Sequence, residues 1–365
     1  MAVKFEAKIG SRNEWISLFH TFLKASPDHS RELSEDEKLA VVPGAKLHAR
    51  LFGSEECFWR IADATIDGTP VPANLSYAFK SHWSVRDPDA KQEHATLANL
   101  PSPKARVSKW YFCVGREGCE RQSYLIKTSV MSALGRTSLR PICIYSGMTT
   151  EVEDFLKRHG VTMIPASFPL TEDLDETLAG RTDYSSAMAH GSYLRLMIPV
   201  IEKDDEFVLY ADYDCIFARD PDISADGIQF VAAAPETDQS NWGWFNNGVL
   251  VMNVPALRSI YDRMIRIISL RLRSGLFAVH EQGEMNAIFW MKWNRLKLQQ
   301  NWKPYWGANE SAEIIHYHGP KPLEISRRLQ SQQFGDDTIA HFLTKNVEGY
   351  RYYNEMFASY GFLQG

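Results

Sequence analysis

Residues Phe207–Phe217 read FVLYADYDCIF, an apolar run that ends in two aspartates separated by one residue. The run before the aspartates carries no charge, which is typical of a strand buried on both faces of a sheet. Because side chains alternate along an extended chain, we expect Asp212 and Asp214 on the same side where the strand leaves the sheet. In open α/β sheets this edge is also where ligands bind.

The two carboxylates form the first candidate site. Held together at a strand end, Asp212 and Asp214 repel each other unless a cation lies between them. An isolated Asp-x-Asp also occurs at ordinary strand ends, so the pattern alone leaves a structural role open. Together with the rest of the chain, it predicts a divalent metal that holds a phosphate-bearing substrate.

The composition is that of a globular protein with room for two domains. The chain has 365 residues, of which 44% are hydrophobic and 23% are charged. Its formal net charge of −5 argues against general affinity for nucleic acid, which needs a basic surface. The cysteines form no Cys-x-x-Cys signature, and Cys113 and Cys143 are expected to be buried thiols in a reducing compartment.

No targeting or membrane segment is evident. The amino-terminal residues Met1–Lys8, MAVKFEAK, lack the basic-then-apolar order of a signal peptide. No run approaches the roughly 20 apolar residues of a transmembrane helix, so we expect a cytoplasmic protein. The basic amphipathic segment 258–273 is expected to turn Arg263, Arg266 and Arg271 toward solvent, with peripheral contact to anionic lipid as the alternative.

The composition changes at residues 85–106, which are polar, contain three prolines and predict a linker. Before it, apolar clusters such as Leu39–Gly44 and Leu47–Gly53 alternate with turn residues, as in a small β module. Residues 33–83 resemble a small SH3-like barrel. We therefore predict an accessory module over 1–84, with a role in acceptor recruitment or protein interaction, and a catalytic domain with a C-terminal extension over 107–365.

Strand and helix patterns alternate after the linker. Strands are expected at residues 110–114, 141–145, 160–164 and 207–211, and helices at residues 123–134, 151–159 and 187–198. This alternation predicts an open, mainly parallel α/β sheet that is flanked by helices.

Three polar segments follow the aspartates. Trp244–Asn253 (WFNNGVLVMN) is a tight turn that leads into an apolar strand, and His280–Asn286 (HEQGEMN) opens a helix, where polar groups also serve as caps. In Ile314–Pro322 (IIHYHGPKP), His316 and His318 are expected on one side of an extended segment, where either could reach a metal. Alone, each segment also fits an ordinary turn, cap or structural histidine.

In this order, the segments resemble family 8 glycosyltransferases, the retaining enzymes that include glycogenin and the bacterial galactosyltransferases. The resemblance covers roughly residues 108–325. The matching segments are Pro141–Gly147, Tyr193–Leu196, Leu209–Asp214, Phe245–Val249 and His316–Gly319. It implies a GT-A-type fold and the transfer of glucose, galactose or N-acetylglucosamine from a UDP-sugar to a carbohydrate, glycolipid, protein or other hydroxyl acceptor.

The resemblance also implies roles by position. The metal ligands would be Asp212, Asp214 and His316, which hold Mn²⁺, with Mg²⁺ as the alternative. The donor would be bound by Arg195, Asp212, Asn247, Gly319 and Lys321. The catalytic positions would be Gln282 beside the anomeric carbon, Asn246 in the sugar pocket and Lys321 at the diphosphate. His318 is expected to be a neighbour of the phosphate or a structural hydrogen-bond partner.

The chain departs from the family pattern in three places. Lys321 follows Gly319 at a short interval and precedes Pro322 and Leu323 instead of Pro-Trp. Glu281–Gly283 (EQG) replaces Asp-Gln-Asp, and Val114–Glu117 (VGRE) replaces the Ala-x-Asp-x-x-Tyr that grips the uridine. These departures affect the prediction of the donor's nucleotide base and sugar more than the prediction of the fold.

The chemistry that follows is front-face transfer, because Gln282 is a poor nucleophile and the departing phosphate can serve as the base. Two other functions stay open. A sugar nucleotidyltransferase usually has a basic, glycine-rich loop after its first strand, whereas Gly115–Gly118 (GREG) is short and acidic. A non-catalytic nucleotide- or sugar-binding protein would fit the acid lost at Gly283, and donor turnover distinguishes it from an enzyme.

Overall fold

The computed structural model describes residues 2–8, 46–52, 60–66, 69–70, 107–179, 185–273, 281–289 and 292–363. Its contacts divide the chain into two compact units. One comprises Met1–Asn99 with Asp262–Trp290, and the other comprises Leu100–Tyr261 with Met291–Gly365. The predicted linker 85–106 lies outside the described residues, and the predicted domain boundaries stay predictions.

The first unit contains a four-stranded antiparallel sheet in the order β1-β2-β3-β4. The strands are β1 (Ala2–Lys8), β2 (Lys46–Phe52), β3 (Arg60–Ile66) and β4 (Thr69–Pro70). The described strands thus have the β-rich character that the sequence predicts, and the rest of the SH3-like segment lies outside the described residues. Two helices contribute to this unit, α10 (Tyr261–Arg273) from its second residue onward and α11 (Glu281–Ile288).

The expectation that Arg271 faces solvent is wrong. Its side chain, in α10, is 3% exposed and pairs with the fully buried Glu284 of α11. Removing a charged side chain from water costs free energy, and an oppositely charged partner buried with it offsets that cost. The hydrophobic pattern of a single helix cannot reveal such a partner.

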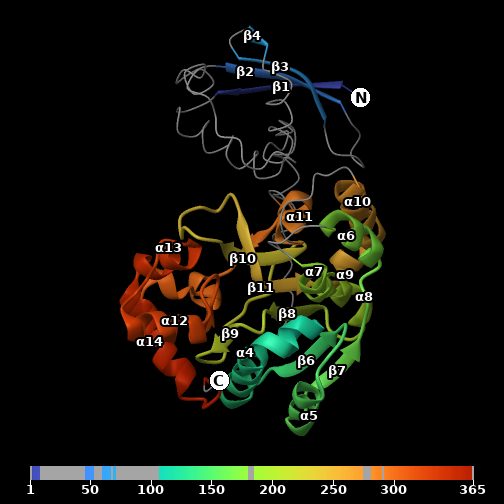
Figure 1. The fold of residues 1–365 in the computed structure, drawn as a ribbon. Helices are drawn as coiled ribbons and strands as arrows, with labels where there is room; N and C mark the ends of the chain where they lie inside the picture. The colour runs from blue at the N-terminus through green and yellow to red at the C-terminus, as the bar shows by residue number, and fades with distance from the viewer. Residues whose placement is uncertain are drawn as a thin grey trace. The chain divides into compact units, whose positions relative to one another are not determined.

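The second unit is built on a seven-stranded sheet in the order β12-β10-β11-β8-β5-β6-β7 (Figure 1). Its strands are β5 (Lys109–Val114), β6 (Arg140–Tyr145), β7 (Thr162–Pro165), β8 (Phe207–Ala211), β10 (Val231–Pro235), β11 (Phe245–Asn253) and β12 (Asn294–Arg295). Strand β11 runs antiparallel to β8 and β10, and the other neighbouring pairs are parallel. The predicted open, mainly parallel α/β sheet is confirmed.

Helices connect and cover these strands (Figure 1). They are α4 (Arg116–Arg136), α5 (Thr150–Arg158), α6 (Thr171–Leu178), α7 (Ser186–Tyr193), the 3-10 helix η3 (Leu194–Met197), α8 (Ile198–Ile201) and α9 (Val254–Ser259). The helix predicted from Ser123 begins at Arg116 and leaves helical geometry at Gln122. The helix predicted over 187–198 is split, with Pro199 in the first turn of α8.

A second, smaller sheet pairs β9 (Cys215–Phe217) with β13 (Ile314–His316) in antiparallel register. Around it lie the 3-10 helices η4 (Leu298–Asn301) and η5 (Pro304–Trp306) and the C-terminal helices α12 (Pro322–Ser331), α13 (Thr338–Lys345) and α14 (Val347–Ala358). Ile216, Ile315 and Tyr317 share one core cluster with Tyr350 and Tyr353 of α14. This packing fixes β13 against the chain that leaves β8.

The strand order reverses at one point of the large sheet. The chain passes from β5 to β6 and β7, and then returns to place β8 on the opposite side of β5. Such a reversal leaves a gap at the carboxyl ends of the two strands, where ligands of α/β proteins bind. At this point Gly115 and Gly191 meet so closely that a Cβ on Gly191 would lie 2.9 Å from the Gly115 nitrogen.

The predicted buried thiols are confirmed, since Cys113 and Cys143 are free and buried. None of the helices in the described part of the chain combines the length and apolar character that spanning a bilayer requires.

Candidate metal and donor site

The Asp-x-Asp lies after the carboxyl end of β8, in a turn rather than in an extended strand. Strand β8, buried along its whole length, ends at Ala211. The Cys215 amide then donates to the Asp212 carbonyl at 3.1 Å, which closes a turn over the two aspartates. The argument from strand alternation is therefore wrong for these two aspartates, because they lie in the turn between the end of β8 and the start of β9 and not in an extended strand.

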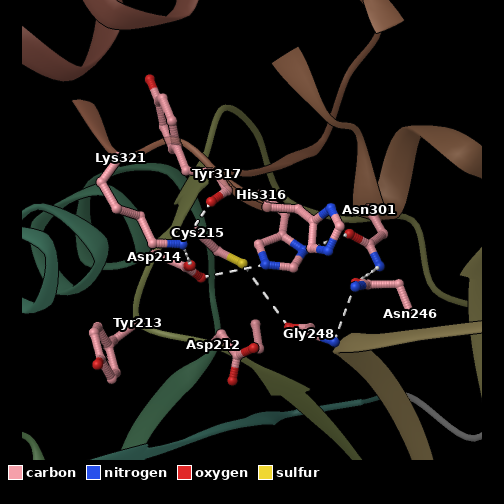
Figure 2. Close-up of polar contacts among 12 residues, drawn as sticks. Asp212, Tyr213, Asp214, Cys215, Asn246, Gly248, Asn301, His316, Tyr317 and Lys321 are labelled. Atoms are coloured by element: carbon pink, nitrogen blue, oxygen red, sulfur yellow. Dashed lines mark hydrogen bonds and ion pairs between the residues drawn. The ribbon is translucent and has the colours of Figure 1, made fainter. Parts of the chain in front are cut away.

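The Asp214 side chain, which is 11% exposed, lies between Lys321 and His316 (Figure 2). Its Oδ2 accepts a hydrogen bond from the Lys321 Nζ at 2.6 Å, and its Oδ1 lies 3.4 Å from the His316 Nε2. Burial raises the pKa of Asp214, but the Lys321 ammonium outweighs that effect and holds the pKa well below the usual range. The carboxylate is therefore ionised at neutral pH.

His316 reaches Asp214 through strand pairing. In the β9–β13 pair, His316 lies opposite Cys215, the residue after Asp214. Its ring is 3% exposed, and burial lowers its pKa to about 4, although Asp214 acts in the opposite direction. The imidazole is thus neutral near pH 7, the state in which it can ligate a metal.

The donors at this point fit a divalent cation. The buried Oδ1 of Asp214 has no hydrogen-bond donor among the described residues. Ligand atoms of Asp214, Cys215 and His316 lie within 4.8 Å of one another. Burial, reinforced by the two carboxylates, raises the pKa of the Cys215 thiol, so this residue stays protonated and is a poor ligand. A carboxylate and an imidazole remain, a donor set that suits Mn²⁺.

Asp212 is held by the protein on one oxygen. Its Oδ1 accepts hydrogen bonds from the Tyr210 hydroxyl and from the Arg195 Nη2 at 3.0 Å. The Arg195 Nη1 also donates to the Asn247 carbonyl at 2.7 Å, and the guanidinium lies 4.5 Å from the centre of the Tyr210 ring. The Asp212 side chain keeps 26% exposure. Arg195 and Asp212 are therefore in direct contact, and their predicted role in donor binding stays a prediction.

The two asparagines that start β11 are almost fully buried. Asn246 is 2% exposed and Asn247 is 4% exposed. The Asn246 Oδ1 accepts from the Gly248 amide at 3.1 Å and from the Asn301 Nδ2 at 3.0 Å. Asn246 is therefore connected to His316 through Asn301. The predicted contacts of both asparagines with a sugar stay predictions.

Gly319 and His318 follow β13. Gly319 has a φ of +86°, and a Cβ there would lie 3.2 Å from the Phe342 ring, so the position requires glycine. The expected extended segment ends at His316, since the His318 amide donates to the His316 carbonyl at 2.8 Å. His318 turns away to Tyr305, 3.0 Å from its Nδ1, and to Glu236, 3.4 Å from its Nε2. Of its two predicted roles, the structure shows the hydrogen-bond partner.

Comparison with known families identifies the chain. The family model "Glycosyl transferase family 8" matches residues 124–322, which is more than half of the sequence. The chain belongs to glycosyltransferase family 8. The resemblance seen in the sequence is confirmed, and the match includes Arg195, both aspartates, His316 and Lys321.

Curated relatives are distant and are matched over only part of their length. Glucoside xylosyltransferase 1 of Gallus gallus is 23% identical over 185 residues, which are 45% of this chain and 37% of that protein. General stress protein A of Bacillus subtilis (strain 168) is 22% identical over 187 residues, 47% of this chain and 63% of that protein. The matched region thus spans less than two thirds of either relative.

Solved structures include the galactosyltransferase LgtC in complex with donor and acceptor sugar analogs. It shares 18% identity, with a TM-score of 0.47, and the match covers 69% of this chain and 95% of that chain.

One predicted family 8 residue lies outside this constellation. Gln282 is in α11, which belongs to the first unit, whereas the aspartates, His316 and Lys321 belong to the second. Its predicted place beside the anomeric carbon stays a prediction.

Sequence reasoning missed three residues that shape the family 8 site, namely Tyr210, Asn301 and Glu236. Tyr210 was counted only as part of an apolar strand, although its hydroxyl bonds to Asp212. Asn301 and Glu236 contact His316 and His318 from far along the chain. A buried Tyr two residues before an acid is a usable signal, because alternation places both on one face of a strand. The other two contacts depend on tertiary pairing alone.

Proposed function

We propose that this family 8 chain is a metal-dependent retaining glycosyltransferase that transfers a sugar from a UDP-sugar to a hydroxyl acceptor. One observation carries the proposal. The ionised Asp214 presents a buried oxygen without a hydrogen-bond donor to the neutral His316, and Lys321 holds its other oxygen, after the carboxyl end of β8. The cytoplasmic location expected from the sequence stays a prediction.

Asp214 and His316 would hold the metal, with Asp212 beside them. When bound, a divalent cation supplies a Lewis acid that neutralises charge on the two phosphates of the donor. Asp212 is bonded to Arg195 and Tyr210 through its Oδ1, and its side chain is 26% exposed, so a cation at the site could approach it. This arrangement favours binding of a nucleoside diphosphate over a neutral ligand.

Lys321 is the second source of positive charge. Its Nζ donates to Asp214 and to the Tyr317 carbonyl at 2.8 Å, and its side chain keeps 28% exposure. An ammonium has three protons, so Lys321 can donate one to a phosphate oxygen while both present hydrogen bonds persist. It would stabilise the charge that develops on the leaving diphosphate.

The stereochemical course is proposed from Gln282, since the resemblance places this residue beside the anomeric carbon and an amide is a poor nucleophile. Front-face transfer, in which the leaving phosphate takes the proton of the acceptor hydroxyl, would retain the anomeric configuration. An intact-mass search for a glycosyl adduct tests this point, because a trapped covalent intermediate would contradict it.

The donor sugar is proposed as a hexose, namely glucose, galactose or N-acetylglucosamine. One relative widens the set to be tested, since it is named a glucoside xylosyltransferase. The panel should therefore hold UDP-glucose, UDP-galactose, UDP-N-acetylglucosamine and UDP-xylose, with the GDP-sugars as controls.

The experiment measures UDP release from this panel with Mn²⁺, with Mg²⁺ and with EDTA, for the wild type and Asp214→Asn. Mannose- and glucose-type acceptors are added so that an acceptor requirement does not hide activity. Metal-dependent release from one UDP-sugar that disappears in the variant is the expected result. Failure of UDP to bind in the presence of Mn²⁺ would overturn the proposal, and UDP binding without turnover of any donor would favour a non-catalytic binding protein.

A further inference from the structure

His316 lies at the end of a hydrogen-bond chain that starts on a backbone amide (Figure 2). The Gly248 N–H donates to the Asn246 Oδ1 at 3.1 Å, and the Asn301 Nδ2 lies 3.0 Å from the same oxygen. The Asn301 Oδ1 in turn lies 3.1 Å from the His316 Nδ1. Asn301 is fully buried, and Asn246 and His316 are nearly so.

The backbone amide sets the direction of this chain because it can only donate. Asn246 must turn its side-chain oxygen toward Gly248, and Asn301 must then offer its NH₂ group to that oxygen. The Asn301 oxygen is left to face His316, whose Nδ1 must carry a proton to complete the third hydrogen bond. In the neutral ring, the Nε2 then carries the lone pair.

The direction matters because the Nε2 lies 3.4 Å from the Asp214 Oδ1. With its proton on Nε2, the imidazole would donate to the carboxylate, and the pair would be satisfied without any ligand. With its proton on Nδ1, the imidazole turns a lone pair toward a carboxylate oxygen that has no donor among the described residues. Two facing acceptors are unfavourable unless a cation lies between them.

We propose that Asn301, anchored by Asn246 and the Gly248 amide, is a positioning residue that keeps His316 in the Nδ1–H tautomer and so keeps the Asp214–His316 pair available to a divalent cation. The inference rests on the metal site of the proposed function. Outer partners of this kind orient metal-binding histidines and set their tautomer.

The surrounding backbone keeps His316 from escaping this arrangement. The His316 amide donates to the carbonyl of Trp302, the residue after Asn301, at 2.8 Å, which ties β13 to η4. The ring packs directly on Gly248, where a Cβ would lie 2.1 Å from the His316 Cε1. The imidazole therefore cannot move off Asn301 without displacing the start of β11.

The test is made on the metal-free protein, so it does not depend on enzymatic turnover. Long-range ¹H–¹⁵N correlation spectra distinguish a protonated ring nitrogen from a bare one. The signals of His316 are assigned by their loss in His316→Gln. We expect the wild-type ring to be protonated on Nδ1 at neutral pH.

Two variants of similar size separate positioning from packing. Asn301→Gln keeps both an oxygen for the Nδ1 and an NH₂ group for Asn246, so its His316 should keep the wild-type tautomer. Asn301→Leu removes that acceptor, so the Nε2-protonated form should appear and Mn²⁺ affinity, measured by calorimetry, should fall about 10–100-fold. If Asn301→Leu does not fold, Asn246→Leu, which removes the anchor of Asn301, provides the same comparison.

The two readouts fail independently. A wild-type ring protonated on Nε2, or a tautomer that stays unchanged when the acceptor or its anchor is removed, would overturn the inference. If the tautomer changes as expected but the wild type binds no Mn²⁺ even with UDP, the control of the tautomer by Asn301 is supported and the proposed metal-dependent function is what fails.

Discussion

Two carboxylates of the second unit are each paired with a lysine, and they differ in how their remaining hydrogen-bonding capacity is used. Glu202 and Lys109 meet at the amino end of β5, where the Lys109 Nζ lies 2.9 and 2.8 Å from the two Glu202 oxygens. The Tyr111 hydroxyl and the amides of Asp204 and Asp205 complete the shell at 2.6, 2.7 and 3.0 Å. Both Glu202 oxygens are satisfied by the protein.

Asp214 and Lys321 lie at the opposite edge of the sheet, after the carboxyl end of β8. Here Lys321 satisfies one oxygen, and the other faces the acceptor nitrogen of His316. Buried polar atoms of folded proteins nearly always have a hydrogen-bond partner, so a buried carboxylate oxygen without a donor indicates a site for a ligand. From this difference we infer that Glu202 serves stability, and the proposed role of Asp214 is ligand binding.

Neutralising Asp214 should have the largest effect, and on activity alone. Asp214→Asn removes the ionised ligand, and we expect turnover to fall at least about 1,000-fold, as loss of several kcal/mol of metal-derived stabilisation implies. The free energy of unfolding should change little, because the mismatch with His316 disappears along with the ion pair. Donor turnover and urea unfolding, measured on the same preparation, check both parts. A loss of stability that matches the loss of activity would contradict this assignment.

Neutralising Glu202 should give the reverse pattern. Burial raises the pKa of Glu202, but Lys109, Tyr111 and the two backbone amides outweigh it and lower the pKa from 4.5 to about 2. This shift is equivalent to about 3 kcal/mol of stability. Glu202→Gln should lose roughly this amount of unfolding free energy at pH 7, while Mn²⁺ affinity stays as in the wild type.

The pH dependence of the Glu202 contribution has a defined sign. Because the folded pKa is depressed, the stability is fully present above 4.5 and is lost as pH falls toward 2. Urea unfolding at a series of pH values should therefore show a steeper acid decline for the wild type than for Glu202→Gln. Parallel curves for the two proteins would show that Glu202 is not the group responsible.

Added Mn²⁺ should stabilise the wild type and Glu202→Gln against unfolding, but not Asp214→Asn. At a free Mn²⁺ concentration 100 times the dissociation constant, binding contributes about 2.7 kcal/mol to folding stability. Thermal unfolding of the wild type and of Glu202→Gln should shift upward by similar amounts, and EDTA should reverse both shifts. Asp214→Asn should show no shift, and an equal shift in that variant would place the metal elsewhere.

The smallest expected effect comes from a matched pair of Tyr→Phe substitutions. Tyr210→Phe removes one donor from Asp212 but leaves Arg195 in place, so Mn²⁺ affinity should fall by about 2- to 10-fold, as loss of one hydrogen bond implies. Tyr111→Phe removes one donor from Glu202 and should lower unfolding free energy by about 1 kcal/mol without changing Mn²⁺ affinity. Calorimetry and urea unfolding check the pair, and interchanged effects would contradict the comparison.

Much of the second unit could be predicted from the sequence. The apolar run before Asp212 marks a buried strand, and the alternation of elements on either side predicts the sheet, because period and length are local properties. Local pattern failed at Asp214, where the return of the chain into β9 depends on pairing with β13, about a hundred residues away. It failed again at the start of α4, where glycines and acids before Ser123 concealed helical residues.

The chemistry of the site could be predicted only as far as the motif residues. His316 and Lys321 meet Asp214, and Arg195 meets Asp212, while the ligand and donor roles that the resemblance implies stay predictions. Asn301 and Glu202 carry no local signal, since each acts through partners distant in the sequence. Which buried carboxylate is satisfied and which is not is a property of tertiary structure, so the contrast between Glu202 and Asp214 is visible only in the fold.

The most direct test of that contrast is a crystal structure of the chain grown with Mn²⁺ and UDP, with anomalous data collected to locate the metal. The account predicts a manganese peak bonded to the Asp214 carboxylate and to the His316 Nε2, with the Glu202–Lys109 pair unchanged. A structure that contains bound UDP, but in which no manganese contacts Asp214 or His316, would contradict it.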